Sequence, residues 1–396
     1  MEFDFLSPID TEIIDYIDGL SSQQLGSKVV LHTSEAYPEI SKLSIGIIGV
    51  VENRGNQKGN PEMDLIAIRK ELYGLYPGNW DVSIADFGDI IAGNTIEDTF
   101  FALKKVAADL IKNKVIPIVI GGSQDLTYAL YRAYDDLEQM VNLVAVDSQF
   151  DFGKESDVVS ASSYLTKIVI EEPNNLFNYC NIGYQTYYNS QEEIDLVEKL
   201  FFDAYRLGEV TNNIAIAEPV FRDADLVSLD MNAVKSSDSG NFSPFIPNGF
   251  NGKEICSLSR YAGISDKVSS FGIFNHNGTE QESVLIAQII WYFIEGFHYR
   301  SNEYPFGSRE NYLKYIVPSE EEELVFYKSD KTDRWWIEIP FTLNGNNKLK
   351  RNTLLPCSHE EYLAACDQEL PERWWKAQRK NSIFVVKSFL NKKIAF

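Results

Sequence analysis

Histidine and cysteine, the side chains that most often bind transition metals, are scarce in this sequence. Four residues of each type occur among 396. The histidines are His32, His276, His298 and His359, and the cysteines are Cys180, Cys256, Cys357 and Cys366. The cysteines have none of the short spacings typical of zinc sites. A chain of this length can bury a large core without disulfides, so we expect free thiols in a reducing cytoplasm.

Basic residues are few relative to acidic ones. The chain has 36 Lys and Arg against 58 Asp and Glu, a formal net charge of −22 and a pI near 4.6. This charge repels a phosphate backbone, so nucleic acid is not an expected partner. No stretch approaches the roughly 20 apolar residues that span a bilayer, and residues 1–4 lack the basic start of a signal peptide. We therefore expect no membrane insertion and a cytoplasmic location.

The remaining pattern favours an α/β protein with three parts. Residues 1–42 predict a helical lead-in, and residues 43–300 alternate short β-branched runs with helical stretches, as βα units around a parallel sheet do. The predicted strands are residues 44–51, 115–120, 143–146, 181–183, 226–229 and 268–274. The predicted helices include residues 99–112, 192–205 and 280–297.

Residues 301–396 lose the βα rhythm and are predicted to form a C-terminal appendage. They hold four of the six tryptophans, in the pairs Trp335-Trp336 and Trp374-Trp375. Residues 372–396 contain seven Lys or Arg and one Glu. Burial of tryptophan and attraction of a basic end to an acidic body both favour docking. We therefore expect an appendage that packs on the α/β domain, with the tryptophans in its core.

Polar side chains gather where three predicted strands end. The strands run into residues 121–125 (GGSQD), 147–151 (DSQFD) and 230–235 (DMNAVK). Carboxyl ends of parallel strands meet at one edge of a sheet, where ligands bind. The side chains expected at this edge are Gln124, Asp147, Gln149, Asp151, Asp230 and Asn232.

These segments resemble, in the same order, the ureohydrolase motifs Gly-Gly-Asp-His-Ser, Asp-Ala-His-x-Asp and Asp-x-Asp-x-x-Asp-Pro. Further matching segments are Asn53-Arg54-Gly55, Ile68-Arg69, residues 86–89, and Pro247, Gly249 and Glu254. The chain thus resembles the arginase, agmatinase and formimidoylglutamase family over about residues 43–300. The resemblance implies an arginase-like, doubly wound, mainly parallel sheet with helices on both faces. In the family, two histidines and four carboxylates bind a Mn²⁺ pair whose bridging hydroxide attacks a guanidinium or formimino carbon.

The chain departs from the family at the positions that bind the metals. Gln124 and Gln149 replace both ligand histidines, and Asn232 replaces one carboxylate, while Asp147, Asp151 and Asp230 remain. Neutral amides bind divalent transition ions far more weakly than imidazole does. No histidine lies in residues 161–165, where the family has its proton-shuttling histidine. The resemblance therefore predicts a degenerate site with no cofactor, or with a weakly bound Mn²⁺ or other divalent cation.

Several interpretations of these residues stay open. The three aspartates could cap strand ends, hold a weak Mg²⁺, Ca²⁺ or Na⁺, or serve a working metal centre. The amides could fill the old metal cavity with hydrogen bonds, and the Lys235 ammonium could substitute for the lost ions. Glu254 matches the family's substrate-side glutamate, with Lys253 before it in place of Arg, but it could simply open a helix. If the protein is active, Glu254 and Asp151 are the catalytic candidates; His276 is expected to be structural.

The resulting functional hypothesis is a pseudoenzyme that acts as a scaffold or protein-binding module. Its expected partner is another protein or further copies of the same chain. One alternative is a divergent, metal-dependent formimidoylglutamase-like or agmatinase-like hydrolase of linear amidines. Another is a non-catalytic sensor that binds a guanidino compound or an amino acid through Glu254. Function must be argued from the site, because the fold alone does not decide between these classes.

Overall fold

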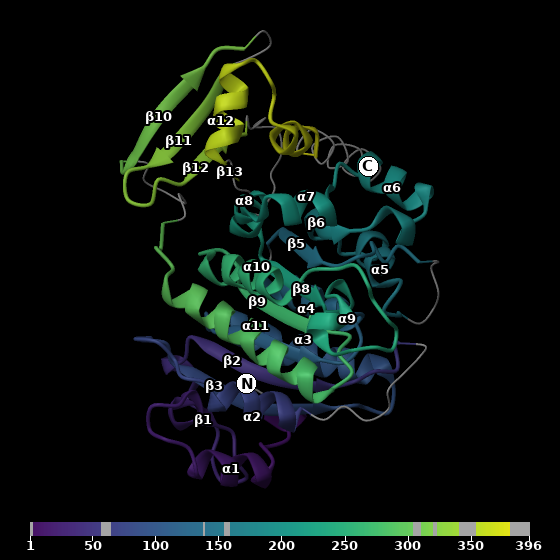
Figure 1. Ribbon diagram of the computed structural model, residues 1–396, viewed down its shortest axis with the longest axis vertical. Coiled ribbons are helices and arrows are strands. Elements are labelled where there is room, and N and C mark those ends of the chain that lie inside the picture. Colours follow the sequence, from purple (N-terminus) through teal and green to yellow (C-terminus); the bar gives the residue numbers. More distant parts are fainter. Residues whose placement is uncertain are drawn as a thin grey trace, which may run out of the picture.

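The computed structural model describes residues 3–56, 65–137, 139–153, 159–303, 310–319, 323–339 and 354–380 of the 396. Its long axis runs from an N-terminal segment, through a central sheet, to a small C-terminal sheet (Figure 1). The basic end beyond Lys380 lies outside these ranges. Within them, no helix has both the length and the apolar character needed to cross a membrane.

The central sheet has the doubly wound form that the sequence predicts. Its strands are β1 (Val30–Leu31), β2 (Ile45–Val51), β3 (Ile84–Ile91), β4 (Ile116–Gly121), β5 (Val141–Val146), β6 (Leu176–Tyr184), β7 (Asp203–Arg206), β8 (Leu226–Asp230) and β9 (Ser270–Phe274). They lie in the order β1-β3-β2-β4-β9-β8-β5-β6-β7, and every neighbouring pair is parallel. Strands β2, β4, β5, β8 and β9 are almost wholly buried, as expected of strands covered on both faces.

Three strands of this sheet were missed, and one predicted helix was too long. Strands β1, β3 and β7 do not appear among the predicted strands. Helix α6 (Gln191–Lys199) ends well before residue 205, because Phe201 adopts a left-handed backbone (φ 56°) and the Phe202 N–H bonds back to Val197 O at 2.9 Å. The chain then enters β7, which pairs with β6.

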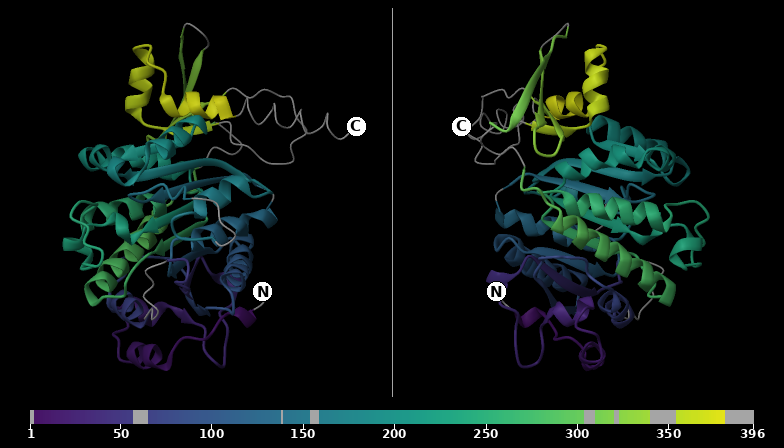
Figure 2. Two further views of the ribbon diagram at one scale, coloured as in Figure 1. Left: turned by 90° about the vertical axis from the view of Figure 1, so that its right-hand side faces the viewer. Right: turned by 60° about the vertical axis from the view of Figure 1, so that its left-hand side comes forward.

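Helices cover both faces of the sheet, and each face has its own apolar core (Figure 2). One core includes α2 (Ile66–Gly74), α8 (Ala217–Asp223), α10 (Gly252–Ile264) and α11 (Glu280–His298). The other includes α3 (Ile96–Lys112), α4 (Leu126–Arg132), α5 (Tyr164–Ile170) and α6. Helices α10 and α11 pack closely because Gly263 has no side chain; a Cβ there would lie 2.1 Å from Phe293 O.

The N-terminal part carries α1 (Thr11–Asp18) and also adds β1 to the edge of the central sheet. Helix α1 is capped by Asp10, whose side chain accepts the Glu12 N–H at 2.7 Å. Ile13 of this helix is 1% exposed and joins the core under α2. The segment is therefore packed on the domain and extends its sheet.

The appendage is an antiparallel sheet of β10 (Tyr312–Val317), β11 (Leu324–Ser329), β12 (Trp335–Glu338) and β13 (Leu354–Cys357), with α12 (His359–Cys366) and a helical segment at 372–380. Trp335 and Trp374 lie in one core with Phe326, and Trp336 lies on the opposite face of the sheet. Trp375 is 36% exposed, so three of these four tryptophans are core residues, as expected.

The described part of the appendage is docked on the α/β domain. Arg222 of α8 donates to Trp335 O at 3.1 Å and to Cys357 O at 2.8 Å, and its guanidinium lies 4.8 Å from the centre of the Trp336 ring. Lys376 donates to Phe202 O at 3.1 Å and lies 3.6 Å from Asp203 Oδ1, at the amino end of β7. Both the tryptophans and the basic helix thus contribute to docking, for the two physical reasons that the sequence indicated.

Candidate functional site

The three polar segments lie together at the carboxyl edge of the central sheet. Gln124 follows β4 in the turn that leads into α4, Asp147 directly follows β5, and Asp230 is the last residue of β8. Strand order places β5 next to β8, with β9 between β8 and β4. Gln124, Asp147 and Asp230 are between 0% and 5% exposed. The fold therefore brings Gln124, Asp147 and Asp230 to one edge of the sheet and buries them.

Asp147, Asp151 and Asp230 form a buried acidic cluster in which the pKa of each carboxyl group is raised. Burial is the main cause that raises the pKa of Asp147 and Asp151 well above its usual value, and the charges of the neighbouring aspartates raise it further. Burial also raises the pKa of Asp230 to about 7. Asp151 adopts a left-handed backbone (φ 58°), which is uncommon for a residue other than glycine. Three charged carboxylates cannot coexist here without protons or a cation.

Hydrogen bonds at the strand ends satisfy part of this cluster. Asp147 Oδ1 accepts the backbone N–H of Gln149 at 2.9 Å, and Asp230 Oδ1 accepts that of Asn232 at 2.7 Å. Asp230 Oδ2 accepts the Asn275 side-chain amide at 2.8 Å. These contacts correspond to the strand-end capping interpretation, in which the aspartates organise the turns that follow β5 and β8.

The three amide side chains at the former ligand positions lie in different surroundings. Gln124 Nε2 donates to Ser228 Oγ at 2.8 Å, while its Oε1 is buried with no hydrogen-bond partner among the described residues. The Gln149 side chain is exposed. Asn232 is half-buried, and hydrogen bonds from its backbone and side chain to Asp230 lower the pKa of that carboxyl. Only one of the three amides therefore bonds to an aspartate of the cluster.

Lys235 has a different partner from the one that the sequence led us to expect. Its Nζ lies 3.4 Å from Asp238 Oδ1, on α9 (Ser236–Ser239), outside the cluster. No lysine is among the groups that shift the pKa of Asp147, Asp151 or Asp230. The hypothesis that this ammonium substitutes for the metal ions is therefore unsupported, because the loop after β8 directs Lys235 towards the short helix that follows it.

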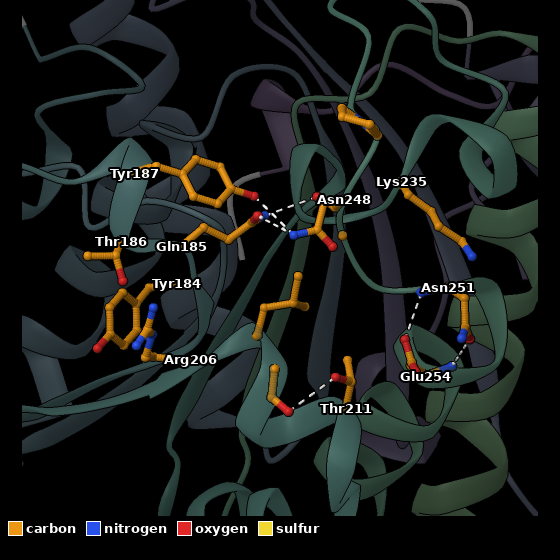
Figure 3. A pocket seen from close by; sticks show the side chains of 14 residues that line it. Tyr184, Gln185, Thr186, Tyr187, Arg206, Thr211, Lys235, Asn248, Asn251 and Glu254 are labelled. Carbon is orange, nitrogen blue, oxygen red and sulfur yellow. Dashed lines mark hydrogen bonds between the residues drawn. The ribbon is translucent and has the colours of Figure 1, made fainter.

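Glu254 lies in the first turn of α10, which agrees with the interpretation that it begins a helix. Asn251 Oδ1 accepts the Glu254 N–H at 2.9 Å, and Glu254 Oε2 accepts the Asn251 N–H at 2.9 Å. This reciprocal pair is a capping box, which stabilises the first turn of a helix. Glu254 also lines a cavity of about 470 Å³ next to the acidic cluster, together with Lys235 (Figure 3).

The sequence did not identify Asn275 and Ser228 as parts of this site. Asn275 adopts a left-handed backbone (φ 57°) directly after β9; its Oδ1 accepts the Gln124 N–H at 3.1 Å and its Nδ2 donates to Asp230. Its position after the predicted strand 268–274 was a usable signal. His276, next to it, is 2% exposed, and burial lowers its pKa to about 4. The imidazole is therefore neutral and internal, as expected of a structural histidine.

Other family-like segments form structural ion pairs. Arg54 Nη2 lies 2.5 Å from Glu52 Oε2, and Arg69, at 3% exposure, lies 2.8 Å from both Asp86 Oδ2 and Asp89 Oδ1. The Arg69 pairs join helix α2 to β3, whereas Arg54 and Glu52 belong to the same turn after β2.

Comparison with known proteins agrees with this architecture, an α/β domain of the arginase-like type. The family model described as "Arginase family" matches residues 44–293. This protein belongs to the arginase family. A Staphylococcus aureus formimidoylglutamase is 23% identical over 288 residues, which is 65% of this chain and 90% of that protein.

Solved structures show the same fold. A Trypanosoma cruzi formiminoglutamase with Mn²⁺ superposes with a TM-score of 0.62 at 20% identity, covering 70% of this chain and 99% of that one. A Bacillus subtilis formimidoylglutamase gives a TM-score of 0.59 at 16% identity, covering 74% and 100%. The family match ends before β10, so the appendage is additional to the shared domain.

The residues present do not fit the manganese pair of the family. Within the described residues, no group of three or more His, Cys, Asp or Glu side chains is arranged to hold a metal ion. The donors at the cluster are carboxylates and amides, and its one nearby histidine, His276, follows β9 and is not one of the former ligand positions. Amide oxygens suit hard cations and bind Mn²⁺ more weakly than imidazole does.

Proposed function

We propose that this protein is a non-hydrolytic member of the arginase family, a pseudoenzyme that acts as a protein-binding scaffold in the cytoplasm. The observation that supports it best is the state of the acidic cluster. Its carboxylates accept hydrogen bonds from the Gln149 and Asn232 backbones and the Asn275 side chain, and amides stand at Gln124 and Gln149 in place of the family's ligand histidines.

The appendage supports the scaffold part of the proposal. Strand β10 is an edge of the appended sheet, and its Leu313 and Ile316 are 54% and 52% exposed. An edge strand with exposed apolar side chains can pair with an extended segment of another protein. The partner in this proposal is a protein that adds a strand to β10.

Metal content and hydrolysis test the pseudoenzyme part. The purified protein, loaded with Mn²⁺ and desalted, should retain near none by elemental analysis, and should release no glutamate, formamide or urea from formiminoglutamate, agmatine or arginine. Two ions per chain together with turnover at enzyme-like rates would instead support the alternative, a divergent amidinohydrolase.

Co-purification tests the scaffold part. Leu313→Ser/Ile316→Ser removes the apolar side chains of β10, whereas Leu363→Ser changes a comparably exposed leucine (49%) on α12. Quantitative mass spectrometry of low-salt pull-downs should show a partner that the double variant loses and the control retains. If both variants retain the same proteins, β10 is not the docking strand.

A second candidate function, binding of a small molecule without turnover, is favoured by the cavity beside the cluster. It has a volume of about 470 Å³, and both charged and amide side chains line it. This size is within the range of ligand pockets in proteins. Saturable binding of a small molecule without product release would support this candidate.

A further inference from the structure

The cavity is distinct from the degenerate metal site. Its walls come from the ends of β6 and β7, from α7 (Leu207–Asn212), from the loop after β8 and from the start of α10. None of the six residues at the former ligand positions lines it. It is bounded in part by Pro247, Gly249 and Glu254 of the family-like segment.

Two cations face this cavity from opposite sides. Arg206 lies beside Tyr184 at one end, and Lys235 lies at the other (Figure 3). Among the described residues, no carboxylate forms a salt bridge with Arg206, and its side chain is exposed. Lys235 has a loose pair with Asp238, at 3.4 Å. A charge-assisted hydrogen bond is usually about 2.7–2.9 Å long, so Lys235 keeps capacity for another acceptor.

Glu254, the one carboxylate among the described residues that line the cavity, already accepts a hydrogen bond. Glu254 Oε2 accepts the Asn251 N–H, and the Glu254 N–H is bound by Asn251 Oδ1. A guanidino ligand that approached Glu254 would compete with this capping box and would meet the charge of Lys235 nearby. The expected attraction for a cationic ligand is therefore weak.

The upper wall is held in place before any ligand arrives. Asn248 Nδ2 donates to Gln185 Oε1 at 3.1 Å and to Tyr187 Oη at 3.0 Å, and Gln185 Nε2 donates to Asn248 O at 3.1 Å. These bonds join the loop after β6 to the loop before α10, as Figure 3 shows. A wall ordered in this way reduces the entropy that a ligand must overcome.

We propose that this cavity binds a small anion, a carboxylate or a phosphate, with Arg206 as the main anchor and Lys235 as a second cation. The proposal rests on the ligand-binding function given above as the second candidate. The arginine fork matches both anions, because it presents parallel N–H donors to two oxygens. The net charge of −22 repels polyanionic macromolecules, whereas a small anion is governed by charges within about 8 Å at physiological salt.

Calorimetric titration of the full-length protein with three probes tests the proposal. The probes are glutarate, inorganic phosphate and agmatine, each at low and at physiological salt. We expect glutarate or phosphate to bind, and Arg206→Gln to weaken that binding by at least about tenfold, the loss typical of a charge-assisted bond. Whichever of the two anions binds identifies the source. Arg379→Gln, an exposed arginine on the helical segment 372–380, is the matched control and should leave affinity unchanged.

Three results would overturn the proposal: binding of no anion, anion binding that Arg206→Gln leaves intact, or agmatine binding that only Glu254→Gln abolishes. Thermal unfolding of each variant checks that the fold is kept. None of these results bears on the pseudoenzyme proposal, which is judged by metal content and product release.

Discussion

The side-chain amide nitrogen of Gln124 donates to Ser228 Oγ at 2.8 Å, inside the carboxyl edge of the sheet. The residue at the first former ligand position is thus bound to a neutral hydroxyl on β8, and Thr127 Oγ1 lies 2.6 Å from the same oxygen. Replacing Gln124 by histidine would remove this amide contact, which leaves the imidazole able to turn towards a metal ion.

Restoring the family's ligands should restore metal binding. In the variant Gln124→His/Gln149→His/Asn232→Asp, two imidazoles and one carboxylate are regained, and imidazole binds Mn²⁺ much better than an amide does. Elemental analysis should show more Mn²⁺ per chain than in the parent protein. Hydrolysis need not return, because residues 161–165 still lack a histidine.

The matched control makes the same changes at exposed positions, Gln23→His/Gln191→His/Asn212→Asp. It should bind no more Mn²⁺ than the parent does. Equal uptake by both triple variants would show that the degenerate centre is not the site of binding.

Asp125 should make the protein less stable as the pH rises. Burial, aided by the charge of Glu52, raises the pKa of Asp125 to about 7, and the residue is 0% exposed. The native state therefore binds a proton that the unfolded state loses near pH 4, so stability falls between pH 4 and 7. The substitution Asp125→Asn should remove about 3 kcal/mol of the decrease in unfolding free energy that the parent protein shows between pH 5 and 8. Thermal unfolding at both pH values measures it.

Asp15→Asn, at an exposed position on α1, is the control for this prediction. Its unfolding midpoint should fall between pH 5 and 8 as steeply as that of the parent protein. If Asp125→Asn behaves in the same way as this control, Asp125 is already ionised in the native state at pH 5.

Arg222→Ala should loosen the appendage. The guanidinium makes two hydrogen bonds to appendage carbonyls and lies over Trp336. Its removal takes a buried hydrogen-bond donor away from both carbonyls, at a cost of about 1–3 kcal/mol each. Limited proteolysis should then release the appendage faster than in the parent protein. Arg379→Ala, which removes an arginine over the exposed Trp375 ring, should not change the rate.

Alanine substitutions of the adjacent residues Trp374 and Trp375 should differ strongly in their effect on the free energy of unfolding. Trp374 is 2% exposed, lies in the appendage core and donates from Nε1 to Glu338 O at 2.8 Å. Trp374→Ala should therefore cost about 3–5 kcal/mol of stability. Trp375 is 36% exposed, so Trp375→Ala should cost about 1 kcal/mol or less. Similar losses in denaturant unfolding would contradict the burial difference.

Much of the fold could be predicted because its signals are local. The buried strands β2, β4, β5, β8 and β9 are short β-branched runs, and α3 and α11 have apolar residues at helical spacing. The order of the polar segments after β4, β5 and β8 carried the family resemblance. The strands β3 and β7 were not predicted because polar residues interrupt them (Asp86, Asp89 and Asp203). Ion pairs with Arg69 and Lys376, together with hydrogen bonds from Tyr73 and Asn178, offset the cost of burying these carboxylates.

By itself, the sequence determined that three strand ends carry these aspartates and amides, because the chemical identity of a side chain and its place after a strand are both properties of the chain. The tertiary structure alone decided which groups meet. It paired Lys235 with Asp238, bound Gln124 to Ser228 and brought Asn275 to Asp230 from 45 residues away. It also placed Arg206 and Lys235 across one cavity. Such contacts depend on loop directions and on the packing of distant strands, which no local pattern specifies.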